Sequence, residues 1–275
     1  MGKIVWIASY PESGAYWLSM FLANLISDSK VPCSMQERDT IIPAENSAKL
    51  HQPFFNRPLD EIPMKELAEK RPIVHRELAK RANEFLLLRT HNAALRHYGH
   101  LTVTPESAAA AIYIVRNPLD IAVSYGAANG RAIDRTIAHM AQTGRVLGKS
   151  SKCTYEIVGS WSEHVESWTS RVRGRFLCLR FEDILDDPER QFSQVIDFLG
   201  MKATTGQIAK ASGHSINGIL EAYRKAGIRM APLLSPLELL QSGAAIRGKR
   251  LLTTQQIAAI AGAHHDQMRR FGYWK

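Results

Sequence analysis

Residues 9–14 of this chain, Ser-Tyr-Pro-Glu-Ser-Gly, form a short polar loop suited to binding an anion. They interrupt the apolar run at residues 4–8 with turn-forming residues. Beyond the loop, apolar residues recur at helical spacing from Leu18 to Ile26, which predicts a helix beginning near Ala15. Backbone N–H groups of the loop then converge at the positive end of a helix, and such a place binds phosphate.

A second set of reactive side chains, Arg89-Thr90-His91, follows the apolar residues 85–88. This run predicts a buried strand with polar groups at its carboxyl end, where ligands bind in open α/β sheets. His91 is therefore a candidate base. A structural role is the more frequent alternative for a lone histidine.

Arg116 stands between a strand pattern and a helix pattern. Residues 108–115 read as a buried strand, while Asn117 suits a helix N-cap and Pro118 suits the first helical position. The guanidinium of Arg116 is then expected beside a helix N-terminus, with Ser124 on the second turn of that helix. A planar donor there suits a phosphate group, the alternative being an arginine that only ends a strand.

The bulk properties indicate one large core and an excess of positive charge. The chain has 275 residues, 45% of them hydrophobic, and no shift in composition marks a linker, so we expect one domain over residues 1–275. Strand patterns that lead into helix patterns are typical of an α/β fold. The net charge of +9 favours an acidic ligand, with a solvated basic surface as an equal alternative.

Cysteine usage and the N-terminus favour a reducing compartment. The three cysteines, Cys33, Cys153 and Cys178, lack metal-binding spacing, and an odd number argues against a disulfide framework. The start of the chain lacks a signal-peptide pattern, Trp6 stands where myristoylation requires Ser or Thr, and no stretch approaches the roughly 20 apolar residues of a membrane span. We expect a cytoplasmic protein whose partners are neither membranes nor nucleic acids.

Four segments resemble, in order, motifs of the PAPS-dependent sulfotransferase family. Residues 10–17, Tyr-Pro-Glu-Ser-Gly-Ala-Tyr-Trp, are similar to the family's first cofactor loop, Tyr-Pro-Lys-Ser-Gly-Thr-Thr-Trp. Residues 115–125, Val-Arg-Asn-Pro-Leu-Asp-Ile-Ala-Val-Ser-Tyr, closely match its second cofactor motif, and residues 159–168 and 177–189 resemble its later helix and strand motifs. The resemblance implies a single-domain, P-loop-like, three-layer fold with a central parallel sheet flanked by helices.

The resemblance also implies the reaction and the residues that serve it. PAPS would be the donor, PAP the product and a hydroxyl or amine of a small molecule the acceptor, with no metal. His91 would be the base, Trp17 would stack on adenine, and Arg116 with Ser124 would bind the 3′-phosphate. The cofactor-binding residues that the resemblance implies lie in the first loop, in the second motif and in the helix predicted from residue 215. They are Ser13, Gly14, Ala15, Tyr16, Trp17, Arg116, Ser124 and Ser215.

A basic stretch near the C-terminus, Arg247-Gly248-Lys249, is the candidate to close over the 3′-phosphate. Gln241 occupies the position that matches the family's arginine, so another basic side chain has to replace it. A solvated basic turn is the equal alternative.

Glu12 replaces the loop lysine that in the family donates to the bridging oxygen. Loss of one charged hydrogen bond costs about 1.5–3 kcal/mol, and a carboxylate about 4 Å from an anionic oxygen adds roughly 4 kcal/mol of repulsion at an effective dielectric of about 20. Catalysis therefore requires Glu12 to turn away, to be protonated or to pair with a cation. Arg89 is the candidate to neutralise Glu12 or to take over the donor role, and Ala15 and Tyr16 remove two further hydroxyl donors.

Three hypotheses follow. The first is an active PAPS sulfotransferase in which Arg89 compensates for Glu12. The second is a catalytically impaired protein of the same fold that binds a nucleotide or an acidic partner. The third, a nucleotide kinase, is disfavoured because the chain has neither GxxxxGK[ST] nor GxGxxG.

The remaining segments are assigned mainly to scaffold. We expect residues 28–70 to be loop with short helical pieces that line the acceptor pocket, with His51, Phe54 and Phe55 as lining residues. An equal alternative is that Phe54 and Phe55 only plug the loop onto the core. Helices are expected over residues 215–226 and 253–271. Trp161, Trp168 and Phe198 are expected to pack in the core. Glu182 is expected to hold a neighbouring loop.

Overall fold

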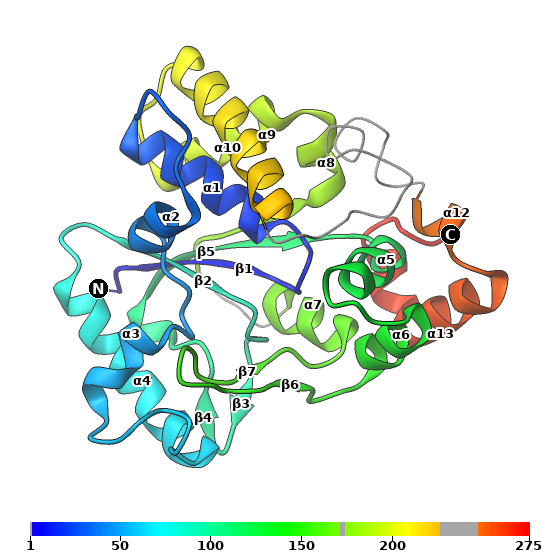
Figure 1. Ribbon diagram of the computed structural model, residues 1–275, viewed down its shortest axis with the longest axis horizontal. Helices are drawn as coiled ribbons and strands as arrows, with labels where there is room; N and C mark the ends of the chain where they lie inside the picture. The colour runs from blue at the N-terminus through cyan, green and yellow to red at the C-terminus, as the bar shows by residue number, and fades with distance from the viewer. Residues whose placement is uncertain (1, 171–173, 226–246) are drawn as a thin grey trace.

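Four parallel strands form the centre of the molecule (Figure 1). The computed structural model describes residues 2–170, 174–225 and 247–275. The strands are β1 (Ile4–Ser9), β2 (Leu86–Thr90), β5 (Ala108–Val115) and β8 (Phe176–Arg180), in the order β2-β1-β5-β8. This arrangement confirms the predicted α/β fold with a central parallel sheet.

Helices cover both faces of the sheet. Side chains alternate along β1, so that Trp6 faces one hydrophobic core and Ile7 faces the other. Helices α1 (Ala15–Ser27), α9 (Pro188–Leu199) and α10 (Thr205–Lys225) pack on the Ile7 side, and α7 (Trp161–Thr169) and α13 (Thr254–Arg270) pack on the Trp6 side (Figure 1). The result is the three-layer arrangement expected from the sequence.

Shorter elements surround these layers. Two small antiparallel hairpins pair β3 (Arg96–His97) with β4 (His100–Leu101) and β6 (Val146–Leu147) with β7 (Glu156–Ile157). The remaining helices are α2 (Met35–Ile41), α3 (Ala48–His51), η1 (Gln52–Phe54), α4 (Met64–Arg81), η2 (Pro105–Ser107), α5 (Pro118–Ala128), α6 (Ile133–Ala141), α8 (Phe181–Asp186) and α12 (Arg247–Leu251).

The segment before the second strand is more helical than expected. Residues 28–70 were predicted to be loop with short helices, but α4 begins at Met64 and runs for 18 residues with Pro72 inside it. Its buried face includes Arg71 and His75, so polar residues occupy positions where the apolar pattern of a helix is normally read. Similarly, α10 begins ten residues before Ser215, at Thr205, and the expected basic turn at residues 247–249 lies within α12.

Several scaffold predictions are confirmed. Trp161 and Trp168 are fully buried in one core, and Phe198 packs against the other. Glu182 accepts a hydrogen bond from the backbone N–H of Asn117 at 2.8 Å and a second from the hydroxyl of Tyr273. It therefore ties the end of β5 to the C-terminal segment.

Among the described residues, no helix has both the length and the apolar character needed to cross a lipid bilayer.

Candidate active site

The predicted anion loop follows the carboxyl end of β1 and leads directly into α1. Ser13 donates its backbone N–H to the carbonyl of Tyr10 at 3.2 Å, and Glu12 and Gly14 have φ angles of 63° and 112°. Both residues are in the left-handed region, which costs Glu12 more than Gly14 because only Glu12 has a Cβ atom. These two conformations turn the chain from the strand into the helix.

The start of α1 leaves backbone donors available to a ligand. The N-cap residue Gly14 makes no side-chain capping bond, and the first N–H of the helix with a backbone acceptor is that of Leu18, which donates to Gly14 at 3.1 Å. The N–H groups of Ala15, Tyr16 and Trp17 have no intrahelical acceptor, whereas that of Ser13 is already used in the turn. The geometry suits one phosphate group on the loop.

Arg116 joins the loop to the next strand. Its Nη1 donates to the backbone carbonyl of Glu12 at 2.6 Å and to the hydroxyl of Ser124 at 3.3 Å, while its guanidinium lies 4.4 Å from the centre of the Phe181 ring. Nε of this buried side chain has no partner among the described residues. A buried N–H without an acceptor favours an anionic ligand that could supply one.

The helix that carries Ser124 begins as the sequence predicts. The side chain of Asn117 accepts from the N–H of Leu119 at 3.0 Å, with Pro118 as the first residue of α5. This cap fixes the direction of the chain immediately after Arg116. The structure thus brings Arg116, Ser124 and the loop together, as the two motifs implied.

His91 lies directly after β2 with its ring fixed by β1. Nδ1 is 2.7 Å from the backbone carbonyl of Ser9, and because a carbonyl oxygen only accepts, Nδ1 carries the hydrogen. In the neutral ring Nε2 then has the free lone pair. The ring orientation is therefore the one that a general base needs.

The backbone of His91 is held from two further directions. Its N–H donates to Glu156 Oε1 at 2.9 Å, and its carbonyl accepts from His164 Nε2 at 3.1 Å. Burial lowers the pKa of His164 to about 3, which keeps this ring neutral, so Tyr113 donates its hydroxyl hydrogen to Nδ1 at 2.9 Å. Trp168 donates to the next carbonyl, that of Asn92, at 2.9 Å.

Glu12 has an environment that favours its neutral form. Burial raises the pKa of its carboxyl, and the charges of Arg116 and His91 lower it by less, so that the net direction is upward. Of the three ways to reconcile Glu12 with an anionic ligand, burial favours protonation.

Arg89 does not neutralise Glu12, contrary to one of the two roles expected for it. Its Nη2 donates to Asp39 Oδ1 at 2.5 Å and its Nε to the carbonyl of Ile42 at 3.1 Å. The part of the chain that the structure describes contains no ion pair between Arg89 and Glu12. Burial, followed by the repulsion of Arg38, lowers the pKa of Arg89 to about 10, so the side chain remains a cation at neutral pH.

Trp17 and Ser215 lie together but are enclosed. Trp17 donates its indole N–H to the Ser215 hydroxyl at 2.9 Å, and its ring makes edge contacts with Phe181 and Phe192. Only 3% of Trp17 is exposed, which leaves little of the ring for contact with a nucleotide base. Stacking on adenine stays a prediction.

The C-terminal basic residues lie near the start of α5. The N–H of Gly248 donates to Asp120 Oδ1 at 2.7 Å, and a Cβ atom at this position would be 2.5 Å from the Cβ of Leu119. Glycine is therefore required where α12 contacts α5. The side chains of Arg247 and Lys249 and the whole of Gln241 lie outside the described part of the structure.

His51 has a structural position rather than the pocket position expected for it. Its Nε2 is 3.2 Å from Glu45 Oε1, and the same fully buried carboxylate contacts His75 and Arg71. Arg71 and the two histidines hold the pKa of Glu45 well below its usual range despite burial. Phe55, the neighbour of Phe54, packs against a third small hydrophobic core.

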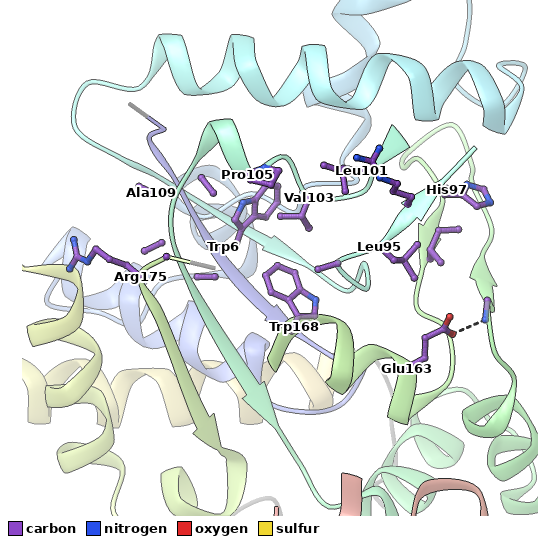
Figure 2. A pocket seen from close by; sticks show the side chains of 18 residues that line it. Trp6, Leu95, His97, Leu101, Val103, Pro105, Ala109, Glu163, Trp168 and Arg175 are labelled. Carbon is purple, nitrogen blue, oxygen red and sulfur yellow. Dashed lines mark hydrogen bonds between the residues drawn. The ribbon is translucent and has the colours of Figure 1, made fainter. Parts of the chain in front are cut away.

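A cavity of about 850 Å³ lies at the opposite end of the sheet from the loop (Figure 2). Trp6 and Trp168 form part of its wall, together with the four alanines at residues 108–111 that open β5. Among the described residues that line it there is neither His91 nor Arg116 nor any residue of the loop. This cavity is therefore not the candidate active site.

The side chains at the site fit an anionic ligand. The buried hydroxyl oxygens of Ser9 and Tyr16, on either side of the loop in sequence, have no hydrogen-bond partner among the described residues. Hydroxyl, guanidinium and backbone N–H donors are the groups that bind phosphate and sulfonate oxygens. Within the described ranges, no group of three or more His, Cys, Asp or Glu side chains is placed to hold a metal ion.

Sequence reasoning missed several residues that shape the site. Asp39 and Arg38 come from α2, Glu156 from β7, and His164 was assigned to scaffold as part of its helix motif. Only His164 had a signal in the sequence, its place in that motif. The others lie in polar or short segments without any pattern.

Comparisons with known proteins agree on one family. A family model described as "Sulfotransferase domain" matches residues 3–225. Among curated proteins, the chain is similar to Sulfotransferase 2A1 of Mus musculus, with 37% identity over 34% of this chain and 32% of the relative. It is also similar to Sulfotransferase 2A6 of Mus musculus, with 26% identity over 59% of this chain and 57% of the relative. In both cases the match spans less than two thirds of the relative's length.

Solved structures share the fold at low sequence identity. Mouse sulfotransferase SULT7A1 complexed with PAP aligns with a TM-score of 0.57 and 18% identity, covering 97% of this chain and 85% of the other. Retinol dehydratase in complex with androsterone and PAP aligns with a TM-score of 0.57 and 17% identity, covering 97% and 80%.

Proposed function

Because this chain belongs to the sulfotransferase domain family, we propose that it transfers a sulfonate group from PAPS to a hydroxyl or amine of a small-molecule acceptor. One observation carries the proposal. Three chain segments converge at the carboxyl end of the sheet, and they bring an unfilled helix N-terminus, a buried arginine with a free N–H and a correctly oriented imidazole into one site.

The donor would be bound through its two phosphate positions. The N–H groups of Ala15, Tyr16 and Trp17 would hold the 5′-phosphate at the start of α1. Arg116 and Ser124 would hold the 3′-phosphate, the arginine through its Nε, which has no partner in the described part of the chain. Arg247 and Lys249 are proposed to bind the 3′-phosphate as well, and the N–H of Gly248 between them donates to Asp120 of α5.

His91 would act as the base. Its Nε2 accepts the proton of the acceptor hydroxyl or amine as the new bond to sulfur forms and the bond from sulfur to the bridging oxygen breaks. Nδ1 remains fixed on the carbonyl of Ser9, so the ring does not rotate away when it becomes charged. Positioning of this kind, together with stabilisation of charge, supplies most of the catalysis in group transfers between two oxygens.

Arg89 and a neutral Glu12 would together replace the family's loop lysine. A protonated Glu12 removes the repulsion that a carboxylate would exert on the bridging oxygen, and burial supports that form. Arg89 keeps its charge and lies two residues before His91, so it is the nearest described cation along β2 to serve as donor.

The acceptor is proposed to be small and the protein cytoplasmic. Androsterone and retinol are bound by the structures that share this fold, which supports a small-molecule acceptor here without naming it. We also propose that residues 1–275 act as a single domain.

Calorimetric titration tests the cofactor site. The purified chain is titrated with PAP, PAPS and ATP, and so are Arg116→Ala and the matched variant Arg190→Ala, whose side chain is exposed on α9. We expect PAP and PAPS to bind the wild type and Arg190→Ala, with about tenfold or greater loss in Arg116→Ala from the missing charged hydrogen bonds. Failure of PAP to bind the wild type at millimolar concentration would overturn the proposed function.

Binding without turnover is the second candidate, and the pairing of Arg89 with Asp39 favours it. To distinguish transfer from binding alone, release of PAP from PAPS is measured in the presence of a panel of phenols, alcohols and amines. An active enzyme releases PAP, whereas a protein that only binds the nucleotide does not. The variant Glu12→Lys sharpens the comparison. If it gains turnover that the wild type lacks while both bind PAP, the chain binds the nucleotide without catalysis.

A further inference from the structure

Two arginines from different elements share one carboxylate, Arg38 from α2 and Arg89 from the strand that leads to His91. Arg38 and Arg89 both donate to one carboxylate oxygen, Asp39 Oδ1, at 2.8 Å and 2.5 Å from their Nη2 atoms. Two cations share one anion, so the cluster carries a formal excess of one positive charge. Asp39 is half exposed, whereas only 3% of the Arg38 side chain is exposed.

Tyr16 belongs to the same cluster. The guanidinium of Arg38 lies 4.2 Å from the centre of the Tyr16 ring, a stacking contact that fixes its plane. Tyr16 is the second residue of α1, and its backbone N–H is one of the three that are proposed to hold the 5′-phosphate. In the sequence, Tyr16 was predicted to bind the cofactor within the loop, and its side chain counted there as a lost threonine hydroxyl.

Two donors in the cluster have no acceptor. Nη1 of Arg38 and the hydroxyl of Tyr16 are both buried without a hydrogen-bond partner among the described residues. An unsatisfied buried donor is costly, and more so when it is charged. Their shared requirement is an anion that presents several oxygen atoms.

The residues next to the cluster in sequence indicate which anion it would bind. Tyr16 adjoins the loop that would hold the 5′-phosphate, and Arg89 lies two residues before the base. A group that passes from that phosphate to an acceptor deprotonated by His91 must lie between them. Glu156 adds a further link, since it holds the N–H of His91 and its charge acts on Arg89.

We propose that Arg38, Arg89 and Tyr16 form a subsite for the sulfonate group in transfer, with Asp39 holding the two guanidinium groups in place. The proposal rests on the proposed function. As the sulfur–oxygen bond to the donor phosphate breaks, its electron pair passes to that phosphate oxygen. The acceptor oxygen forms the new bond to sulfur and its proton goes to His91 Nε2. The three sulfonate oxygens remain on the guanidinium and hydroxyl donors throughout, because two arginines offer the planar donor pairs that such oxygens accept.

The difference between PAP and PAPS tests this directly, because PAP lacks the sulfonate. Both are titrated calorimetrically into the wild type, Arg38→Ala, Tyr16→Phe and Arg57→Ala, an exposed arginine paired with Glu66 that serves as the control. We expect Arg38→Ala to weaken PAPS about tenfold or more and PAP less than about twofold. Tyr16→Phe keeps the ring beneath Arg38 and should weaken PAPS about threefold or more without changing PAP.

The outcomes separate the two proposals. An equal effect of Arg38→Ala and Tyr16→Phe on PAP and PAPS, or no effect on either, overturns the sulfonate subsite while leaving the proposed function in place. If Arg38→Ala melts at a lower temperature than the wild type, its binding data are set aside. The comparison of PAP with PAPS in Tyr16→Phe then decides whether the sulfonate subsite exists. A wild type that binds neither nucleotide overturns both proposals.

Discussion

Under the proposed function, Glu12 occupies a position where the ligand would need a donor, and burial favours the neutral form of its side chain. A carboxylate in that place repels the ligand, but a neutral carboxyl does not. The pKa of Glu12 is raised because burial outweighs the attraction of Arg116 and His91. Burial therefore shifts Glu12 toward the protonated form that the proposed chemistry tolerates.

Glu12→Gln should stabilise the protein more at neutral than at acid pH. A raised pKa means that the folded state prefers the protonated form. Below the unfolded-state pKa of about 4.3 that preference is satisfied, and as pH rises through the higher folded-state pKa the stabilisation is lost. Glutamine has no charge to bury, so its advantage in melting temperature should be larger at pH 7 than at pH 4.

The exposed Glu69→Gln is the control for this comparison, because its side chain lies in solvent on α4. It should show little difference between the two pH values. An equal shift for Glu12→Gln at pH 4 and pH 7 would show that Glu12 is not held neutral.

His91→Ala should abolish most turnover and leave nucleotide binding intact. Loss of a positioned base costs a factor of about 10²–10⁴ in rate, whereas the ring contacts the protein through Ser9 rather than through the loop N–H groups. Turnover of PAPS and calorimetric binding of PAP are measured together. The exposed His265→Ala is the control, and retention of full turnover by His91→Ala would remove His91 from the mechanism.

Strands and helices could be predicted from the sequence where apolar residues form a continuous run. They could not be predicted where polar side chains are buried. The four sheet strands follow from runs such as residues 4–8 and 108–115, because a strand buried on both faces has to be apolar throughout. Helix α4 was missed because Arg71 and His75 lie on its buried face and serve the carboxylate of Glu45. These two polar side chains can be buried only because Glu45, from a different segment of the chain, pairs with them. A single sequence does not show which distant residue provides such a partner.

The same distinction applies to the site. Arg116, Ser124 and the start of α1 could be located because caps and turns have local signatures, and Asn117 with Pro118 is one of them. The choice of Asp39 rather than Glu12 as the partner of Arg89 depends on where α2 packs. No spacing in the sequence encodes that choice.

Asn117→Ala should weaken both the fold and the nucleotide site. Loss of an N-cap costs about 1 kcal/mol, or about 2–4 °C of melting temperature for a chain of this size class, and the cap directs the chain just after Arg116. Thr253→Ala removes a comparable cap from α13. We expect similar melting temperatures for the two variants but weaker PAP binding only in Asn117→Ala. Equal affinities of the two variants for PAP would show that the Asn117 cap does not contribute to nucleotide binding.

At the scale of the whole molecule, ligand binding and stability are linked. The three segments of the site belong to three strands of one sheet, so a nucleotide that binds them stabilises the folded state as a whole. The net charge of +9 also favours association with a polyanion.

PAP should therefore raise the melting temperature of the chain. At a concentration of about 100 times its dissociation constant the gain is about 2.7 kcal/mol, or roughly 5–10 °C. Thermal melting with and without PAP measures it. Arg116→Ala should show a much smaller shift at the same concentration, and an identical shift in that variant would place PAP elsewhere.

The order of strands in the sheet has a consequence for how the candidate site forms during folding. The central strand β1 pairs with β2 and β5, which are synthesised long after it, and the contact between Arg116 and Glu12 joins residues 104 apart in the sequence. Such high contact order makes folding slow, because distant segments must meet before any pairing is rewarded. In refolding from denaturant, helical circular dichroism should therefore recover before PAP binding does, and a nascent chain that ends before Arg116 should bind no nucleotide.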